Sequence, residues 1–148
     1  MALEIAERNA GREELIIIGI KENGIFIAQK IAAYLVTVFP GKINTISLSI
    51  NKKDPGAVTL SDETNLRGKA VLLADDVANS GRTMLYALRP LLDMFPAQIE
   101  TLALVERTHK LFPVGLNYIG LSVATSAEEN IVVTTENGEI TGAEIRRN

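Results

Sequence analysis

Apolar residues follow two distinct patterns along the chain. Residues 15–20 (LIIIGI) form a continuous apolar run rich in β-branched side chains, which is typical of a strand buried on both faces of a parallel sheet. Between residues 25 and 38 the apolar side chains recur every three or four positions, which predicts a helix. The same patterns predict the remaining elements: a helix over residues 2–9, strands over residues 43–50, 69–76, 99–107, 118–123 and 130–135, and a helix over residues 84–95 that Pro90 should kink or end early. Strands that alternate with helices indicate an α/β fold, with a mostly parallel sheet of about five strands flanked by helices.

The longest polar stretch, residues 51–68, lies between the second and third predicted strands. A loop of this length without regular structure is uncommon inside a compact domain, and where it occurs it is usually functional, often as a lid. Its apolar segment, residues 58–60, is expected to form half of a small hairpin. No repeat or linker interrupts the chain, so we expect a single domain over residues 1–148, with residues 51–68 as a flexible flap.

The composition narrows the class of protein. The net charge of −3 gives no overall nucleic-acid footprint, although a local basic patch stays open. The absence of cysteine excludes disulfides and thiolate metal sites, and the single histidine excludes a histidine cluster. No apolar run is long enough for a membrane span, and the charged, amphipathic start differs from a signal peptide. We therefore expect a soluble, cytoplasmic protein without a membrane partner.

Residues 71–83 (VLLADDVANSGRT) carry the clearest chemistry. Open parallel sheets bind ligands beyond the carboxyl ends of their strands, where Asp75 and Asp76 are expected to lie. The following residues are small, include a glycine and two hydroxyls, and lead into a helix N-terminus, which favours a phosphate. Two carboxylates would repel that phosphate unless they bind another part of the ligand, such as sugar hydroxyls or a water-linked Mg²⁺. The string therefore predicts a sugar phosphate site.

A purely structural interpretation accounts for part of this segment. The fragment Ser-Gly-Arg-Thr alone is a common pattern at helix N-termini, with a hydroxyl as cap and glycine in the turn. The whole string of apolar strand, paired acids, small polar turn and helix is much more specific than that fragment. It is neither a Walker A loop nor a dinucleotide-binding glycine loop.

Three segments resemble the type I phosphoribosyltransferases. Residues 71–83 resemble the family's phosphoribosyl pyrophosphate (PRPP) signature, and residues 19–32 (GIKENGIFIAQKIA) resemble its pyrophosphate loop with the helix after it. Residues 102–123 (LALVERTHKLFPVGLNYIGLSV) resemble the base-side segment of two branches, the PyrR-type pyrimidine-operon regulators, which are also uracil phosphoribosyltransferases, and the hypoxanthine-guanine enzymes. The E-R-N ending of the first helix, the G-I-K-x-x-G-I loop and the H-K-x-x-P stretch are closer to the PyrR-type branch.

The resemblance implies a role for each matching position. Asp75 and Asp76 would hold the ribose hydroxyls of PRPP and, through water or the ligand, Mg²⁺. The ribose phosphate would lie in the turn formed by Ala78, Asn79, Ser80, Gly81, Arg82 and Thr83. The pyrophosphate would meet a loop that often contains a non-proline cis peptide in this family, formed by Lys21, Glu22, Asn23 and Gly24. On the base side the matching positions are Val77, Glu106 and Arg107.

The flap completes the implied catalytic set. Residues 51–68 match the flexible segment that closes over the reacting sugar and excludes water. Lys52 or Lys53 would reach the leaving pyrophosphate from there, and a solvated loop tip is an equally open interpretation of this lysine pair. The hood over the base is expected to be small or truncated.

Three positions depart from the family's patterns. Hypoxanthine-guanine enzymes carry an acid at Asn79 and a lysine at Glu106, so both residues argue against a purine 6-oxo substrate. PyrR-type proteins carry an arginine at Asn23, whose absence removes a charged donor to pyrophosphate. The first hypothesis is accordingly a Mg²⁺-dependent phosphoribosyltransferase that converts PRPP and a nucleobase, uracil, in nucleotide salvage.

Two alternatives stay open beside that enzyme. One is a PyrR-like regulator that senses a nucleotide in the same pocket and binds mRNA, with weak or no catalysis. RNA binding needs a basic face, for which the candidates are Lys30, Lys52, Lys53, Arg67, Lys69, Arg89, Lys110, Arg146 and Arg147. The other is a homologue that binds PRPP without turnover. The resemblance further implies a homodimer or a higher homo-oligomer.

Overall fold

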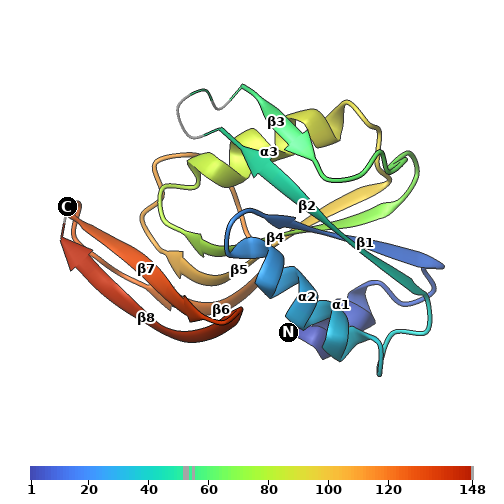
Figure 1. Cartoon of the computed structure of the whole chain (residues 1–148), viewed down its shortest axis with the longest axis horizontal. Coiled ribbons are helices and arrows are strands. Elements are labelled where there is room, and N and C mark those ends of the chain that lie inside the picture. Colours follow the sequence, from blue (N-terminus) through green and yellow to red (C-terminus); the bar gives the residue numbers. More distant parts are fainter. Residues whose placement is uncertain (52–53, 55, 148) are drawn as a thin grey trace.

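The computed structural model describes residues 1–51, 54 and 56–147. Within these residues the chain forms three helices and eight strands (Figure 1): α1 (Ala2–Arg8), β1 (Glu14–Ile20), α2 (Gly24–Leu35), β2 (Lys42–Ile50), β3 (Val58–Leu60), β4 (Ala70–Ala78), α3 (Arg82–Leu92), β5 (Gln98–Arg107), β6 (Tyr118–Val123), β7 (Glu129–Glu136) and β8 (Glu139–Arg147). The predicted elements therefore form, with boundaries shifted by up to three residues.

Six of the described strands form one sheet in the order β3-β2-β1-β4-β5-β6. The neighbours from β2 to β6 pair in parallel, and the edge strand β3 pairs antiparallel with β2. The predicted α/β fold with a mostly parallel sheet is therefore confirmed, and β3 forms the small hairpin expected in the polar stretch. The strand order places β1 and β4 side by side in the middle of the sheet.

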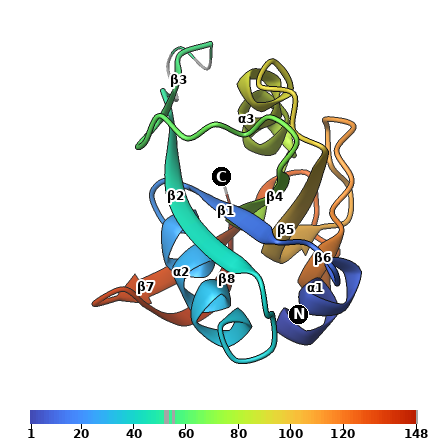
Figure 2. The same ribbon diagram turned by 90° about the vertical axis from the view of Figure 1, so that its right-hand side faces the viewer.

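Helices cover both faces of this sheet (Figure 2). On one face α1 and α2 pack in an apolar core with Leu15 and Ile17 of β1. On the other face α3 shares a second core with Ile16 and Ile18. Successive side chains of a strand point to opposite faces, and both faces of β1 are buried. The sequence of β1 is therefore almost continuously apolar.

The third helix begins and ends earlier than its apolar pattern predicts. It spans Arg82–Leu92, so it ends two residues after Pro90. A proline inside a helix lacks the backbone donor and clashes with the preceding turn, which accounts for the early end. The helix starts directly after Gly81, and its first turn therefore belongs to the polar string that follows the paired acids.

Strands β7 and β8 form a separate two-stranded antiparallel sheet, here called the hairpin. Figure 1 shows it at one end of the molecule. β7 was predicted, but β8 was missed because most of its side chains are exposed and its apolar residues do not alternate regularly. Its two-residue turn, Asn137 and Gly138, has positive φ angles of 50° and 79°. Asn-Gly is the preferred sequence for such a turn, so this dipeptide was the available signal for β8.

A buried polar cluster connects the end of α1 to the sheet, away from Asp75 and Asp76. Glu100 of β5 is 7% exposed, and its Oε2 accepts hydrogen bonds from Asn9 Nδ2 at 2.9 Å and from the Tyr118 hydroxyl at 2.7 Å. Burial raises the pKa of Tyr118, and the neighbouring Glu100 carboxylate raises it further. The hydroxyl therefore stays protonated as a donor. The guanidinium of Arg8 lies 5.1 Å from the centre of the Tyr118 ring.

Candidate active site

A pocket opens where β1 ends and β4 continues. The register of these two strands stops at the pair Gly19 and Ala74, whereas β4 remains paired with β5 as far as Ala78 and Glu106. The resulting cavity, here called the main pocket, has a volume of about 240 Å³. Three segments line it: residues 20–23, residues 75–77 with 79 and 83, and residues 131–133. It lies at the carboxyl ends of the central strands, where the sequence predicted a ligand.

Asp75 and Asp76, here called the acid pair, lie inside the last part of β4 and both line the main pocket. The backbone N–H of Asp76 donates to Asp75 Oδ1 at 2.9 Å, and the N–H of Val77 donates to Asp76 Oδ1 at 2.9 Å. Asp75 is 8% exposed and Asp76 is half-buried. Asp75 also borders a second cavity, so it lies between two spaces that a ligand can occupy.

The second cavity, here called the cup, has a volume of about 100 Å³ and lies below the start of α3. It is lined by residues 75, 77–81, 83 and 84, which include most of the predicted phosphate turn. Gly81 has φ of +80°, and a Cβ there would lie 2.7 Å from Val114 Cγ1, so glycine suits both the turn and its packing. Ser80 Oγ accepts from the N–H of Arg82 at 3.3 Å. The Arg82 side chain is exposed and its guanidinium lies over the Tyr86 ring, 5.6 Å from the ring centre.

The predicted pyrophosphate loop connects β1 to α2 and forms another wall of the main pocket. The peptide bond between Lys21 and Glu22 is cis, the feature that the resemblance implied for this loop. A Cβ on Gly24 would lie 2.7 Å from the carbonyl oxygen of Ala74, so the loop can approach β4 only with glycine there. The Nδ2 of Asn23 donates to Asp76 Oδ2 at 2.8 Å. This amide therefore links the loop to the acid pair.

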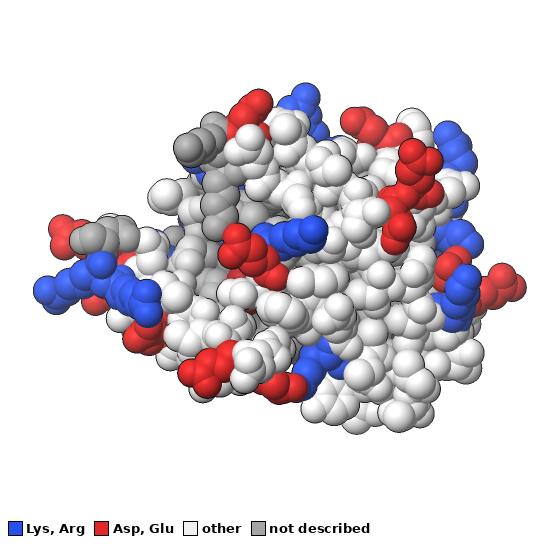
Figure 3. All heavy atoms as spheres, viewed as in Figure 1, with Lys and Arg blue, Asp and Glu red and all other residues white. Residues whose placement is uncertain are grey.

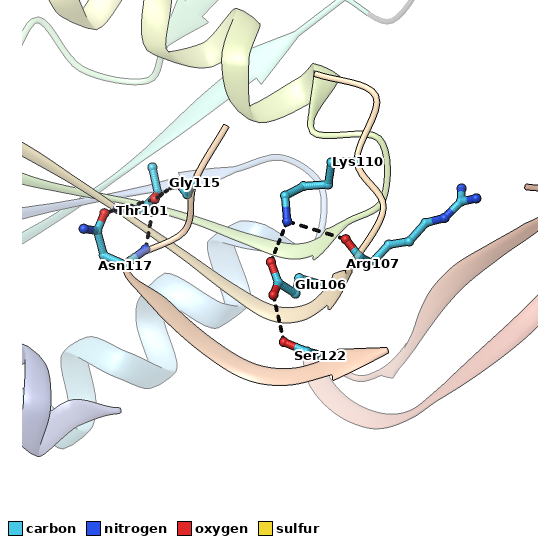
Figure 4. Close-up of polar contacts among 7 residues, drawn as sticks. All are labelled: Thr101, Glu106, Arg107, Lys110, Gly115, Asn117 and Ser122. Carbon is cyan, nitrogen blue, oxygen red and sulfur yellow. Dashed lines mark hydrogen bonds and ion pairs between the residues drawn. The ribbon is translucent and has the colours of Figure 1, made fainter. Parts of the chain in front are cut away.

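The expected base-side residues separate into two groups. Val77 lines both cavities, whereas Glu106 and Arg107 line neither. In Figure 4 the Glu106 carboxylate lies between Lys110 and Ser122, which donate to it at 2.6 Å and 2.8 Å. Burial raises the pKa of Glu106, but the hydrogen bonds from Lys110 and Ser122, together with the Lys110 charge, lower it by more. The net result is a carboxylate held ionised by an intramolecular ammonium group.

Three further hydrogen bonds connect the end of β5 and the segment that follows it to neighbouring backbone. The backbone N–H groups of Leu111 and Phe112 both donate to the carbonyl oxygen of Ser80 at 3.0 Å, which joins this segment to the predicted phosphate turn. The Nη2 of Arg107 donates to the carbonyl oxygen of Ser126 at 2.7 Å and so joins β5 to the chain that leads into the hairpin. Of the base-side positions, Arg107 therefore contacts neighbouring backbone in this structure, whereas Glu106 contacts the side chains of Lys110 and Ser122.

The hairpin supplies a pocket wall that the sequence did not predict. Ile131, Val132 and Val133 of β7 line the main pocket. Ile131 and Val133 are buried against Val105 of β5. The Nδ2 of Asn79 donates to the carbonyl oxygen of Ile131 at 2.9 Å, and the N–H of Ile131 donates to Asn79 Oδ1 at 2.9 Å. The Asn79 side chain thus faces β7, while its backbone remains part of the phosphate turn.

Lys52 and Lys53 lie outside the described residues, so their predicted approach to pyrophosphate stays a prediction. Across residues 1–51, 54 and 56–147, no group of three or more metal-ligating side chains gathers in one place. The acid pair alone suits Mg²⁺, which is usually bound by one or two carboxylates together with ligand oxygens and water. In the part of the chain that the structure describes, none of the helices has the length and apolar character needed to span a membrane.

Comparison with known proteins identifies the family. The family model described as the phosphoribosyl transferase domain matches residues 1–136. The chain belongs to the phosphoribosyl transferase domain family. A member named Bifunctional protein PyrR from Clostridium botulinum (strain Eklund 17B / Type B) is 34% identical over 140 residues, which cover 88% of this chain and 78% of that protein. One of the same name from Enterococcus faecalis (strain ATCC 700802 / V583) is 33% identical over 145 residues, covering 92% of this chain and 82% of that protein.

The solved structures show the phosphoribosyl transferase fold in this chain. A hypoxanthine-guanine phosphoribosyltransferase from Bacillus anthracis superposes with a TM-score of 0.69 at 22% identity, and the match covers 88% of this chain and 76% of that one. The resemblance read from the sequence, to the family and to its PyrR-type members, is therefore confirmed.

Proposed function

We propose that this phosphoribosyl transferase domain protein transfers a phosphoribosyl group from PRPP to a nucleobase, uracil, and releases pyrophosphate. The observation that carries the proposal is the position of Asp75, which borders both the main pocket and the cup. A sugar phosphate can place its phosphate in the cup while its ribose lies along the acid pair. Its pyrophosphate then meets the loop of residues 21–24.

The acid pair and the start of α3 each have a role in the proposed reaction. The acid pair accepts hydrogen bonds from the two ribose hydroxyls, which carboxylate oxygens do well. The start of α3 offers its first backbone N–H groups and the positive end of its dipole to the ribose phosphate. A bound base nitrogen then displaces pyrophosphate at the anomeric carbon, and catalysis consists of holding the two ligands in line and excluding water.

The proposed metal is Mg²⁺, which would be held at the acid pair, mainly through ligand oxygens and water. When bound, the ion supplies positive charge that stabilises the leaving pyrophosphate. The protein's own part is to keep Asp75 and Asp76 oriented, which the backbone donors of Asp76 and Val77 and the amide of Asn23 do. Removal of Mg²⁺ with a chelator is expected to abolish turnover.

Two observations support a pyrimidine over a purine 6-oxo base. The Asn79 amide donates to and accepts from the backbone of Ile131, and an amide has neither the negative charge nor the basicity of the acid that the hypoxanthine-guanine enzymes carry there. Glu106 places a carboxylate where the hypoxanthine-guanine enzymes have lysine, and Lys110 neutralises it within the protein. The relatives named Bifunctional protein PyrR point to the same choice.

The alternative of an mRNA-binding regulator receives less support from the surface. Figure 3 shows Lys and Arg side chains dispersed among Asp and Glu on the face it displays. Four of the candidate basic residues form ion pairs with carboxylates, namely Lys30, Lys69, Lys110 and Arg146. Phosphate contacts need uncompensated positive charge, so RNA binding is the second candidate. An RNA shift assay across a salt series tests it, because binding through phosphates weakens steeply as salt rises.

We also propose that the protein forms a homodimer whose interface includes α2. Tyr34 near the end of this helix and Val36 directly after it are 60% and 70% exposed, which leaves apolar surface for a second copy. Light scattering on the purified protein measures the mass directly, and a monomer at all concentrations would contradict this part of the proposal.

The decisive experiment is a panel of bases with PRPP and Mg²⁺ in which pyrophosphate release is followed. Turnover with uracil and little with hypoxanthine or guanine is expected, and efficient turnover with a purine would contradict the choice of base. The double substitution D75N/D76N should abolish the stabilisation of the fold by PRPP while the free protein stays folded. A matched control, E7Q/D93N, removes two exposed carboxylates outside both cavities and should keep that stabilisation.

A further inference from the structure

The hairpin lies across the main pocket and is tied to it at separate positions. At its near end Arg107 donates to Ser126, and at its far end Lys30 pairs with Glu139, and none of these four residues lines the pocket. Asn79 is different, because it bonds to β7 at Ile131, within the segment that forms the pocket wall. It is therefore the contact that sets the wall itself.

The geometry of the Asn79 contact is that of a neighbouring strand. One carboxamide satisfies both backbone groups of Ile131, with its Nδ2 donating to the carbonyl oxygen and its Oδ1 accepting from the N–H, each at 2.9 Å. The same residue also lines the cup, where the phosphate is proposed to bind. A single residue thus belongs both to the phosphate turn and to the wall formed by the hairpin.

A second amide makes a weaker connection of the same kind. Asn23 of the pyrophosphate loop donates to Asp76 at 2.8 Å, and its Oδ1 accepts from Thr135 Oγ1 at 3.4 Å. The two contacts to β7 therefore originate in the two loops that are proposed to hold the charged ends of PRPP. These hydrogen bonds therefore link the binding of a ligand to the two loops with the position of the hairpin.

We propose that Asn79 is a positioning residue that couples the phosphate turn to the apolar wall of the main pocket formed by residues 131–133, and that the nucleobase packs against this wall. It holds Ile131 in place, so that phosphate in the cup steadies the surface against which the nucleobase packs. The inference rests on the proposed function for its ligands, but its structural part concerns the ligand-free protein. It predicts that loss of the amide weakens the binding of the base much more than that of PRPP.

Three substitutions separate positioning from a general effect on folding. N79A removes both hydrogen bonds, and N79D keeps the shape of the side chain but places a carboxylate against the Ile131 carbonyl oxygen. Protonation of the introduced carboxyl group restores a donor, so N79D should recover as pH falls while N79A should not. E139Q breaks the exposed Lys30–Glu139 contact at the far end of the hairpin and serves as the matched control.

The first measurement is amide hydrogen exchange at Ile131. Its N–H should exchange at least tenfold faster in N79A and, at neutral pH, in N79D than in the wild type, and at the wild-type rate in E139Q. PRPP should slow this exchange in the wild type and not in N79A. An unchanged exchange rate at Ile131 in N79A would overturn the proposal. This readout needs no turnover, so it stands apart from any failure of the proposed reaction.

The second measurement is steady-state kinetics with uracil and PRPP. Loss of the two hydrogen bonds should raise KM for uracil about tenfold, with kcat and the thermal shift produced by PRPP changed less than about twofold. For N79D the KM for uracil should fall towards the wild-type value as pH is lowered. A decrease of KM in N79A would show that the amide obstructs the base, and equal losses for base and PRPP would show a general folding defect; each result contradicts the proposal. Absence of turnover in the wild type would refute the proposed function, while the exchange measurement still decides the role of Asn79.

Discussion

Replacement of Lys110 by methionine tests the account of the Glu106 ion pair. The two side chains are only 14% and 13% exposed, and their charged atoms lie 2.6 Å apart. Methionine keeps the apolar part of the lysine chain but removes its ammonium group. The Glu106 carboxylate then keeps the hydroxyl of Ser122 as its remaining described side-chain donor in a largely buried position. We expect K110M to destabilise the fold at neutral pH.

The magnitude follows from the burial of the pair. Exposed ion pairs contribute about 0.2–1 kcal/mol, whereas breaking a fully buried pair costs about 3–5 kcal/mol. The small exposure of both side chains places this pair between these limits, and Ser122 continues to stabilise the carboxylate. A loss of about 2 kcal/mol in the free energy of unfolding is therefore expected. For a chain of 148 residues this corresponds to a decrease in Tm of about 6 °C.

The pH dependence provides the sharper assay. In the wild type the pKa of Glu106 is lowered, so its ionisation stabilises the fold above the unfolded pKa, and this stability is lost as pH falls through the folded pKa. In K110M burial raises that pKa without the opposing ammonium group. Urea unfolding at neutral pH and near pH 4 should therefore show a difference between the two proteins that shrinks in acid. The double variant E106Q/K110M, with no unpaired charge, should recover about 1 kcal/mol relative to K110M.

Two results would refute this reasoning about Glu106. Equal destabilisation by K110M at both pH values would show that packing, and not the charge, is lost. A cost below about 0.5 kcal/mol at neutral pH would show that the pair behaves as an exposed one.

Two further predictions concern the packing of the pyrophosphate loop and the buried cluster at Glu100. G24A places a Cβ 2.7 Å from a backbone oxygen of β4, so it should lower the free energy of unfolding by about 1–3 kcal/mol. It should also weaken the stabilisation by PRPP in a thermal shift assay. The control G115A, with open space around its Cβ, should have neither effect. Y118F removes the hydroxyl that donates to buried Glu100 and should cost about 1–3 kcal/mol in urea unfolding.

The parts of the fold that sequence reasoning found are those in which local pattern and tertiary burial agree. β1 is buried on both faces, so its apolar run had one consistent interpretation. The acid pair was found because carboxylates at the end of such a run have no packing purpose. β8 was missed because a strand paired on one side and exposed elsewhere carries little apolar signal, and only its Asn-Gly turn marked it.

The composition of the pocket was harder to predict than its position. Ile131 to Val133 were expected in a strand, but no local pattern indicates that this strand reaches across to the crevice between β1 and β4. The partner of Asn79 could not be predicted either. A side-chain amide can bind ligand, solvent or backbone, and the neighbouring sequence does not indicate which of these it binds. Glu106 was expected on the base side, but its carboxylate forms an ion pair with Lys110, four positions later in the chain.

The hairpin has a consequence for how such a protein can change its choice of substrate. It is one uninterrupted segment, residues 129–147, and it contributes to the main pocket only through three consecutive residues of β7. Transplanting this segment as a cassette would alter the wall while leaving the strand ends that carry the acid pair and the cup in place. Such an exchange needs two things to be preserved: the contacts from Asn79, Asn23 and Lys30, and the apolar packing of the hairpin against Val105. The proposed selectivity and the proposed chemistry would then be able to evolve separately.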